Sequence, residues 1–538
     1  MRPRHSKSAA PIPMASLKRA RPRLTRRRFL QMGGTFLGAL AMSGLPAAVF
    51  GASKRLNRVS AYPFTLGVAS GDPTADSVIL WTRIDQAAIA GQDAANDGLQ
   101  IDYEVASDPG FTSIVRTGNV VAPAELGHSA HCEVRGLQPA TEYYYRWRLA
   151  GEISPVGRTK TAPLASATVD SLRFAVASCQ QYEQGFYTAY EHMSNEDLDF
   201  VVHLGDYIYE SSWGRVLVRS HEGPEIHTLS DYRARYTTYK SDLDLQAAHA
   251  AAPWIITWDD HEVDNNYAAD IAEDDQTIDQ LLARRAAGYQ AFYEFTPIRL
   301  PVGRQGPDMP IHRRLRFGNL LEMSVLDTRQ YRSDQACGDG RKPSCAAHQD
   351  PSRTLLGQAQ KKWLFDSLAS ADAKWNVMAQ QIMMASLRSV SDSGEELWPM
   401  DIWDGYPFER AELLRHLHER GTSNPVVLTG DIHSNWVADL QLDFDDERSA
   451  LVGTEFVGTS ITSGGDGVDM SSYGEALLAN NPHVKFYNAQ RGYMLARVDA
   501  QQWQTDFKIV DKVTEKGAAL RTRASYVVET GEAGAKLV

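Results

Sequence analysis

The chain has 538 residues, 43% of them hydrophobic, and a mean hydropathy of −0.36, a soluble globular composition with length enough for more than one domain. Its formal net charge is −12, from 55 basic and 67 acidic residues. Twelve of the basic residues lie within positions 2–55, which leaves the body with 43 basic and 67 acidic residues and a charge of −24. So acidic a body argues against nonspecific binding to nucleic acid and against a nucleic-acid-binding module.

The first residues have the pattern of an export signal. The stretch TRRRFLQ at 25–31 precedes an apolar run from about Met32 to Phe50, and small residues follow. This order predicts a cleaved signal peptide over residues 1–52, and its paired arginines are similar to a twin-arginine signal. The alternative is a membrane anchor, which a short run broken by Pro46 disfavours. We expect the twin-arginine machinery to export the protein to the periplasm or the cell exterior, without a stable membrane span.

Residues 60–165 are predicted to form a small all-β sandwich domain. Four runs rich in β-branched and aromatic residues are separated by turns that contain Asp, Pro and Gly: SVILWTRI, LQIDYEVAS, HSAHCEVRGL and EYYYRWRLAG. Short strands at this spacing are typical of a sandwich. A linker rich in Ser, Ala and Thr follows Pro163.

From residue 170 to 538, apolar strands alternate with helical stretches. The predicted strands include LRFAVASC, LDFVVHLGD, WIITWDD, LLEMSVLDTRQ, WNVMAQQIM and PVVLTGDIH. The predicted helices lie near FYTAYEHMS, SDYRARYTTYKSDLDLQAAHAAAP, TIDQLLARRAAGYQAFYEF and ERAELLRHLHER. This alternation predicts an α/β domain whose sheet is covered by helices on both faces.

Four of these strands end on side chains that can bind metals or transfer protons. They end at Cys179, at Asp206, at Asp259, Asp260 and His261, and at Asp431 and His433. Each residue alone could belong to a turn or to buried packing. Ligands of open α/β sheets bind beyond the carboxyl ends of the strands, so the four ends together indicate one metal site.

The types of ligand indicate more than one cation. The four aspartates offer hard oxygens, which suit Ca²⁺, Mg²⁺ or Mn²⁺, whereas His433 offers a borderline nitrogen and Cys179 a sulfur. Carboxylates this numerous would repel one another without cations, so we expect a multinuclear site. Such a site binds phosphoryl oxygens and generates a hydroxide nucleophile.

The remaining cysteines leave one question open. Cys337 and Cys345 bracket the polar loop CGDGRKPSC, which in an oxidising compartment is equally consistent with a disulfide and with free thiols. Cys132 lies in an alternating strand pattern and is interpreted as structural.

Five motifs in chain order, GDYIYE, WDDHEVDNNY, DTRQYR, LTGDIHSNW and VGTSITSGG, resemble those of the PhoD-like alkaline phosphatases. The resemblance extends over nearly the whole chain. It implies a metallophosphatase α/β core of mixed β sheets flanked by helices, preceded by the small sandwich domain and distantly related to purple acid phosphatases and calcineurin-like metallophosphatases. It also implies a centre of Fe³⁺ and Ca²⁺, the calcium as two ions, that hydrolyses phosphomonoesters and phosphodiesters.

The same resemblance implies which residues bind the metals. Cys179, Asp206, Tyr209 and His433 would surround the iron, and Asp206 would bridge to calcium. Asp431, with Asp259 or Asp260, would complete the calcium side, for which Asn265 and Asn266 are further candidates. A thiolate and a phenolate favour a trivalent ion, because a tyrosine with a reference pKa of about 10 becomes a ligand near neutrality only beside a strong Lewis acid.

Two further residues are expected to be catalytic. His261 would stabilise the transition state or protonate the leaving oxygen; the alternative is a hydrogen bond to Asp206 or Asp431. Arg329 would bind a phosphate oxygen with its planar fork; the alternative is a structural ion pair with Asp327 or Asp334.

The sequence therefore predicts a secreted, monomeric alkaline phosphatase that hydrolyses small-molecule or lipid phosphate esters to scavenge phosphate. A metal-bound hydroxide would attack phosphorus directly, because the strand-end motifs offer no obvious serine or threonine nucleophile. An extracellular nucleotidase or a phospholipase-type phosphodiesterase stays open, since the loops around the pocket decide the substrate. A zinc esterase or lactonase would need more histidines, and a secreted binding protein would carry no metal.

Overall fold

The computed structural model describes residues 53–91, 98–214, 216–300 and 306–538. The predicted signal peptide, residues 1–52, lies outside these ranges. Within them, no helix combines the length and the apolar character that crossing a membrane requires.

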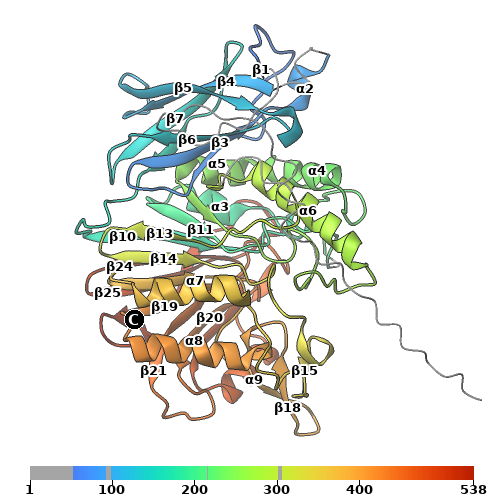
Figure 1. Ribbon diagram of the computed structural model, residues 1–538, viewed down its shortest axis with the longest axis vertical. Coiled ribbons are helices and arrows are strands. Elements are labelled where there is room, and N and C mark those ends of the chain that lie inside the picture. Colours follow the sequence, from blue (N-terminus) through green and yellow to red (C-terminus); the bar gives the residue numbers. More distant parts are fainter. Residues whose placement is uncertain (1–52, 92–97, 215, 301–305) are drawn as a thin grey trace, which may run out of the picture. The chain divides into compact units, whose positions relative to one another are not determined.

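A ten-stranded sheet forms the first of two central layers (Figure 1). From edge to edge its strands are β27 (Lys536–Leu537), β26 (Leu520–Glu529), β25 (Gln502–Val510), β24 (Gly492–Asp499), β10 (Ser171–Ala177), β11 (Phe200–His203), β12 (Trp254–Ile256), β2 (Val68–Gly71), β3 (Ser77–Arg83) and β6 (Ser129–Arg135). Strands β10, β11 and β12 are neighbours and run parallel, so their carboxyl ends meet at one edge of the sheet.

An eight-stranded sheet forms the second central layer. Its strands are, in order, β13 (Arg313–Phe317), β14 (Leu321–Val325), β16 (Trp375–Ala379), β19 (Pro425–Thr429), β21 (Leu451–Val457), β20 (Asn435–Gln441), β23 (Val484–Gln490) and β22 (Gly467–Val468). The two sheets share a core in which Phe174 and Val202 of the first sheet join Leu428 and Phe456 of the second. Burial of these apolar side chains holds the two sheets face to face.

Helices cover the outer face of each sheet. Helices α3 (Thr188–Met193), α4 (Leu229–Lys240), α5 (Leu243–Ala251) and α6 (Ile278–Phe295) pack on the ten-stranded sheet, and α7 (Gly357–Ala369), α8 (Pro407–Arg420) and α9 (Ser472–Asn480) on the eight-stranded one. The mixed sheets flanked by helices are confirmed. The expectation of one sheet with helices on both faces is wrong, because the inner face of each sheet packs on the other sheet.

Capping residues explain where several helices begin and end. Thr277 and Gln280 form a capping box at the start of α6. The stretch 230–253, predicted at helical spacing throughout, divides because Asp242 accepts hydrogen bonds from the backbone of Asp244 and Leu245 and so starts α5 anew. Gly421, with φ 59°, ends α8 in the left-handed conformation that glycine tolerates best.

The predicted all-β region is confirmed and shares a sheet with the rest of the protein. A six-stranded sheet of β1 (Ser53–Lys54), β4 (Gly98–Ala106), β5 (Ile114–Ala122), β7 (Glu142–Leu149), β8 (Glu152–Ile153) and β9 (Gly157–Lys160) packs on β2, β3 and β6. These three strands continue the ten-stranded sheet through a pairing of Gly71 with Trp254. A Cβ atom on Gly71 would lie 2.3 Å from the carbonyl oxygen of Pro297, so this close approach requires glycine.

A small three-stranded sheet of β15 (Arg341–Lys342), β17 (Ser389–Val390) and β18 (Glu396–Pro399) lies beside the second layer. Cys337 and Cys345 form a disulfide in the loop that contains β15, which decides the open question in favour of pairing. Cys132 and Cys179 are free and buried.

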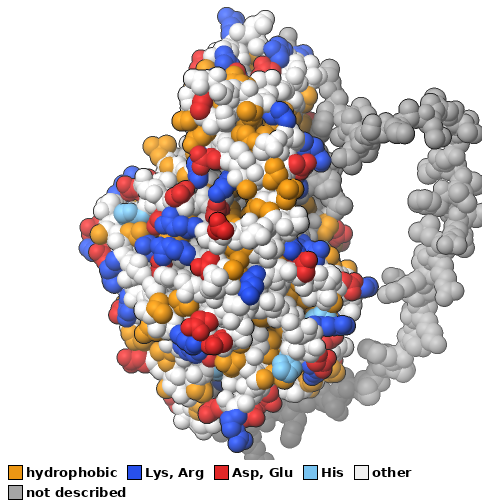
Figure 2. Space-filling model, turned by 90° about the vertical axis from the view of Figure 1, so that its left-hand side faces the viewer, with side chains coloured by type: hydrophobic (Ala, Val, Ile, Leu, Met, Phe, Trp, Pro, Cys, Tyr) orange, Lys and Arg blue, Asp and Glu red, His pale blue; other side chains and the backbone are white. Residues whose placement is uncertain are grey.

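Acidic and basic side chains are interspersed on the face of the molecule that Figure 2 shows. Exposed ion pairs such as Arg55 with Asp102, or Lys362 with Asp366, each contribute about 0–1 kcal/mol. The stability of the fold therefore rests mainly on its buried apolar layers.

Candidate metal centre

The strand-end residues meet where the two sheets lie against each other. Cys179, Asp206 and Asp259 follow the neighbouring parallel strands β10, β11 and β12, and Asp431 and His433 follow β19 of the facing sheet. The residues that the sequence places at four strand ends are thus contributed by two sheets instead of one edge of a single sheet.

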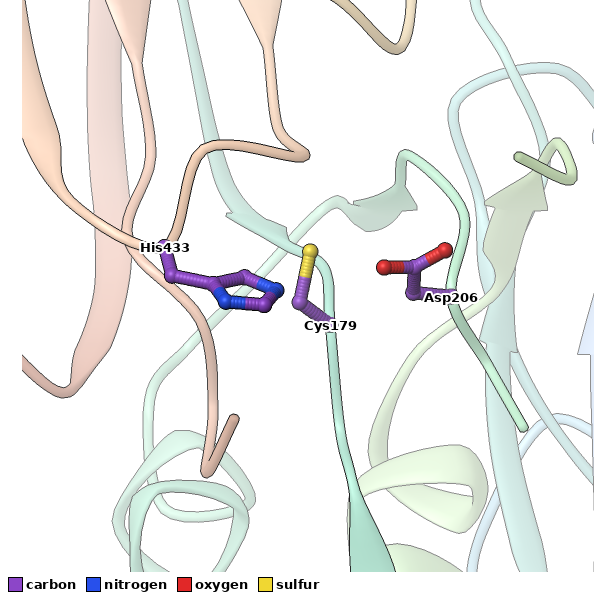
Figure 3. Close-up of side chains that lie close together, drawn as sticks. All are labelled: Cys179, Asp206 and His433. Atoms are coloured by element: carbon purple, nitrogen blue, oxygen red, sulfur yellow. The ribbon is translucent and has the colours of Figure 1, made fainter. Parts of the chain in front are cut away.

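One group of donors consists of Cys179, Asp206 and His433. One candidate ligand atom of each residue lies within 4.8 Å of the others. Figure 3 shows the thiol of Cys179 between the imidazole of His433 and the carboxylate of Asp206, each on its own loop. The hydroxyl of Tyr209 donates to Asp206 Oδ2 at 2.9 Å and lies 3.1 Å from His433 Nε2. The structure thus brings together all four residues assigned to iron.

A second group consists of Asp206, Asp260 and His261, whose candidate atoms also lie within 4.8 Å of one another. Asp206 belongs to both groups, the position that a bridging carboxylate would occupy. Of the two asparagine candidates, Asn266 donates its backbone N–H to Asp260 Oδ2 at 2.8 Å, and the side chain of Asn265 donates to Glu273.

Arg329 lies among four carboxylates. Its Nε donates to Asp259 and its Nη1 to Asp401, the latter at 3.0 Å. Its Nη2 lies 3.7 Å from oxygens of Asp260 and Asp431. The side chain is fully buried and its partners are not Asp327 or Asp334, the two suggested by the nearby sequence. Asp401, which the sequence did not single out, is 72 residues away along the chain.

His261 is held by a partner that the sequence did not predict. Its Nδ1 lies 2.6 Å from Glu210 Oε2, and its ring centroid is 4.1 Å from that of Tyr209. The sequence suggested a hydrogen bond from His261 to Asp206 or Asp431, whereas in the structure the ring is hydrogen-bonded to Glu210. The available signal was the position of Glu210, directly after Tyr209 in GDYIYE.

The loops that carry these donors have a strained backbone. Cys179, Asp206, Asp431 and His433 have φ values of 57°, 56°, 62° and 56°, in the left-handed region that is uncommon for residues other than glycine. Such strain persists where the surrounding structure enforces it, and it clusters at functional sites. Here the constraint includes Glu262, also missed from the sequence.

Glu262 connects two of the loops. Its carboxylate accepts backbone N–H groups of Asp206 at 3.2 Å, Tyr207 at 2.6 Å and Asp259 at 2.8 Å. One buried side chain therefore fixes the backbone after β11 relative to the backbone after β12. The available signal was the fourth letter of DDHE, which lies among the candidate ligands.

Comparison with known proteins decides what kind of centre this is. The model of the family "PhoD-like phosphatase" matches residues 174–507, and that of its N-terminal domain matches residues 51–163. Alkaline phosphatase D of Bacillus subtilis (strain 168) is 47% identical over 521 residues, which is 95% of this chain and 89% of that protein. The chain belongs to the PhoD-like phosphatase family. It is accordingly a metal-dependent hydrolase of phosphoric esters.

Solved structures agree with this assignment. A structure of PhoD, 48% identical, matches with a TM-score of 0.86 and covers 89% of this chain and 92% of its own. Purple acid phosphatase PPD1 from yellow lupin is 13% identical and has a TM-score of 0.53, with 87% of this chain and 74% of its own covered. This second likeness shows that the chain shares the fold of a purple acid phosphatase.

The electrostatics of this PhoD-like centre call for added positive charge. Burial, with the charges of neighbouring aspartates, raises the pKa of Asp206 and of Asp431 well above its usual range, and burial raises the pKa of Asp259 to about 6. Burial and the charge of Asp206 also raise the pKa of the Cys179 thiol and of the Tyr209 phenol. Each group would titrate at an ordinary or lower pH beside a cation.

Two orphaned oxygens support the same conclusion. Asp206 Oδ1 and Asp259 Oδ2 are buried and have no hydrogen-bond partner among the described residues. A buried carboxylate oxygen without a partner is costly unless a cation contacts it. Burial lowers the pKa of His433 to about 3, which keeps its imidazole neutral and able to bind a metal. The donor set therefore fits a metal centre.

Proposed function

We propose that the protein is an exported alkaline phosphatase that hydrolyses phosphomonoesters and phosphodiesters at a centre of Fe³⁺ and two Ca²⁺ ions. The observation that carries this proposal is the group of thiol, phenol, imidazole and carboxylate around Asp206. Thiolate and phenolate donors favour a trivalent ion, whereas the carboxylate-rich side suits calcium.

The donors divide between the ions by type. Cys179, Tyr209 and His433 would hold iron, Asp206 would bridge, and Asp431 with Asp259 and Asp260 would hold calcium. When bound, the ions would neutralise phosphoryl oxygens and lower the pKa of the water that attacks phosphorus.

The protein's own groups would position and transfer protons. Glu210 holds Nδ1 of His261, which leaves Nε2 as the ring nitrogen that would protonate the leaving oxygen. Burial alone would lower the pKa of His261, but Glu210 and Asp260 raise it well above its usual value, which favours the protonated ring that a proton donor needs. Arg329 would offset the charge of Asp259 and Asp260 and hold both in place while phosphate binds.

Attack without a phosphoenzyme follows from the hydroxyl groups nearby. Ser463 Oγ lies 2.7 Å from both the Cys179 carbonyl oxygen and the Tyr209 hydroxyl, and Ser178 Oγ accepts a hydrogen bond from the Cys179 thiol at 3.2 Å. Hydroxyls engaged in this way with the proposed metal ligands are not poised for attack on phosphorus. Rapid quenching should therefore trap no phosphorylated protein, and a chiral phosphate should undergo inversion; a trapped phosphoserine would contradict the proposal.

Export and domain division belong to the same proposal. Residues 1–52 would direct twin-arginine export and be removed, leaving the region 60–165 and the catalytic region 170–538 as a monomer in the periplasm or outside the cell. The paired arginines and apolar run of the leader support this. Small-molecule or lipid phosphate esters would be its substrates, and released phosphate its nutritional product.

Elemental analysis of the exported protein, with monoester and diester assays, tests the proposal. We expect iron and calcium in stoichiometric amounts, hydrolysis of both ester classes, and loss of activity after chelation. Stoichiometric zinc without iron would overturn the cofactor assignment, and metal-loaded protein without esterase activity would overturn the function.

A further inference from the structure

An apolar segment lies directly beside the proposed proton donor. The chain continues from Tyr209 into residues 211–214, where Trp213 is 39% exposed, and residues 216–219, where Val216 and Leu217 are 70% and 42% exposed. The indole of Trp213 lies edge-on to the His261 ring, with centroids 5.6 Å apart and planes at 72°. Trp213 is thus an exposed aromatic side chain beside a polar centre, and Val216 and Leu217 are further exposed apolar side chains of the same segment.

Polar contacts fix both ends of this segment. The side chain of Gln184 donates to the Trp213 carbonyl at 2.8 Å and accepts the backbone N–H of Gly464 at 2.6 Å. Further along, the backbone N–H of Val218 donates to the Glu183 carbonyl at 2.8 Å. Trp213 is thus tied to the turn that follows Cys179.

A second anchor follows Val218. Arg219 pairs with Asp242 at 2.6 Å, and its guanidinium lies 3.7 Å from the centroid of the Tyr182 ring. The apolar side chains of the segment are therefore presented to solvent by a backbone held on both sides, instead of folding back into the core.

We propose that Trp213, supported by Val216 and Leu217, forms an apolar wall for the alcohol part of the substrate and makes the enzyme prefer phosphate esters of apolar alcohols. The inference rests on the proposed role of His261. If His261 protonates the leaving oxygen, the carbon attached to that oxygen extends toward the indole. Covering the indole with an alkyl or aryl group removes apolar surface from water, which favours binding of such esters.

A chain-length series of primary alkyl phosphates tests the wall. Ethyl, butyl and hexyl phosphate have leaving groups of nearly equal acidity, so a difference in kcat/KM reports contact with the alkyl chain and not the chemical step. We expect kcat/KM of the metal-loaded enzyme to rise along the series. Trp213→Ala should reduce the hexyl-to-ethyl ratio roughly five- to tenfold while leaving kcat/KM for ethyl phosphate within about twofold. Trp213→Phe should retain most of the preference.

The matched control is Tyr62→Ala. Tyr62 is another exposed aromatic residue, 42% accessible, in the N-terminal region, where it donates to the Ile153 carbonyl. This variant should keep the wild-type ratio. An unchanged ratio in Trp213→Ala would overturn the proposal, as would an equal fall for ethyl and hexyl phosphate, which would show that Trp213 acts on the centre itself.

Binding without turnover separates this inference from the proposed function. Titration calorimetry with methylphosphonate and hexylphosphonate measures contact with the alkyl chain in the absence of hydrolysis. Tighter binding of hexylphosphonate, lost in Trp213→Ala, supports the wall even if no ester is hydrolysed. Equal affinity of the two phosphonates for the wild-type protein overturns the wall even if hydrolysis proceeds normally.

Discussion

Tyr209 shows how much one hydroxyl oxygen decides at the residue scale. Its ring is buried, and its oxygen lies within hydrogen-bonding distance of Asp206, His433 and Ser463. A phenylalanine would fill the same space without the oxygen. Replacing Tyr209 by phenylalanine removes only the hydroxyl oxygen, so this substitution distinguishes a metal ligand from a residue that only packs.

Tyr209→Phe should remove both the visible absorption band of an Fe³⁺–phenolate pair and a large part of the bound iron. Absorption spectroscopy and iron determination on the purified variant measure the two effects. Tyr207→Phe is the matched control, because its buried hydroxyl contacts His249 Nε2 at 2.7 Å and should cost only about 1 kcal/mol of stability. Retention of band and iron in Tyr209→Phe would show that the residue packs.

Glu210 should set the alkaline limit of activity. Because Glu210 raises the pKa of His261, Glu210→Gln should lower that pKa and move the descending limb of kcat/KM to lower pH. The loss therefore appears in alkaline solution and is smallest at low pH, where His261 stays protonated in both proteins. Glu210→Asp should recover part of the range. A pH–rate profile unchanged in Glu210→Gln would rule out this role.

At the scale of elements, the loop after β11 and the loop after β12 depend on Glu262. In the wild-type protein, backbone N–H groups of both loops donate to the two carboxylate oxygens of Glu262. Glu262→Gln replaces one of these oxygens with an NH₂ group, which cannot accept their hydrogen bonds. We expect a loss of about 1–3 kcal/mol in the free energy of unfolding, measured with urea, and weaker retention of iron. Glu222→Gln, an exposed glutamate substitution, is the control. Equal stability of the two variants would mean that the carboxylate does not hold the loops.

The same scale separates what sequence could predict from what it could not. The candidate metal ligands can be predicted from the sequence, because each lies within a few residues of the end of an apolar strand, as Cys179 and Asp206 do. The packing of one sheet on the other could not be predicted, because a buried strand has the same apolar sequence whether a helix or a second sheet covers it. Asp401 could not be assigned to Arg329, since 72 residues of chain separate them.

For the whole molecule, the shared sheet predicts that the all-β region and the catalytic region unfold together. Gly71→Ala would place a Cβ atom 2.3 Å from Pro297 O and 2.7 Å from Trp254 O at their junction. We expect a loss of about 1–3 kcal/mol and a single calorimetric transition at a lower temperature. Gly110→Ala, whose Cβ meets nothing nearer than 3.8 Å, should unfold like the wild type. Two separate transitions in the wild-type protein would contradict this coupling.

The order of strands in the ten-stranded sheet also governs when the centre can form during synthesis. Strand β10, which leads to Cys179, lies between β11 and β24, and β24 is made more than 300 residues after β10. A nascent chain on the ribosome therefore cannot complete the neighbours of β10 until residue 499 has emerged. Pairing across so long a stretch is slow, so the side chains of the candidate metal centre come together only after most of the protein has been translated. We therefore expect the protein to bind its metals late, after most of the chain has been synthesised and folded.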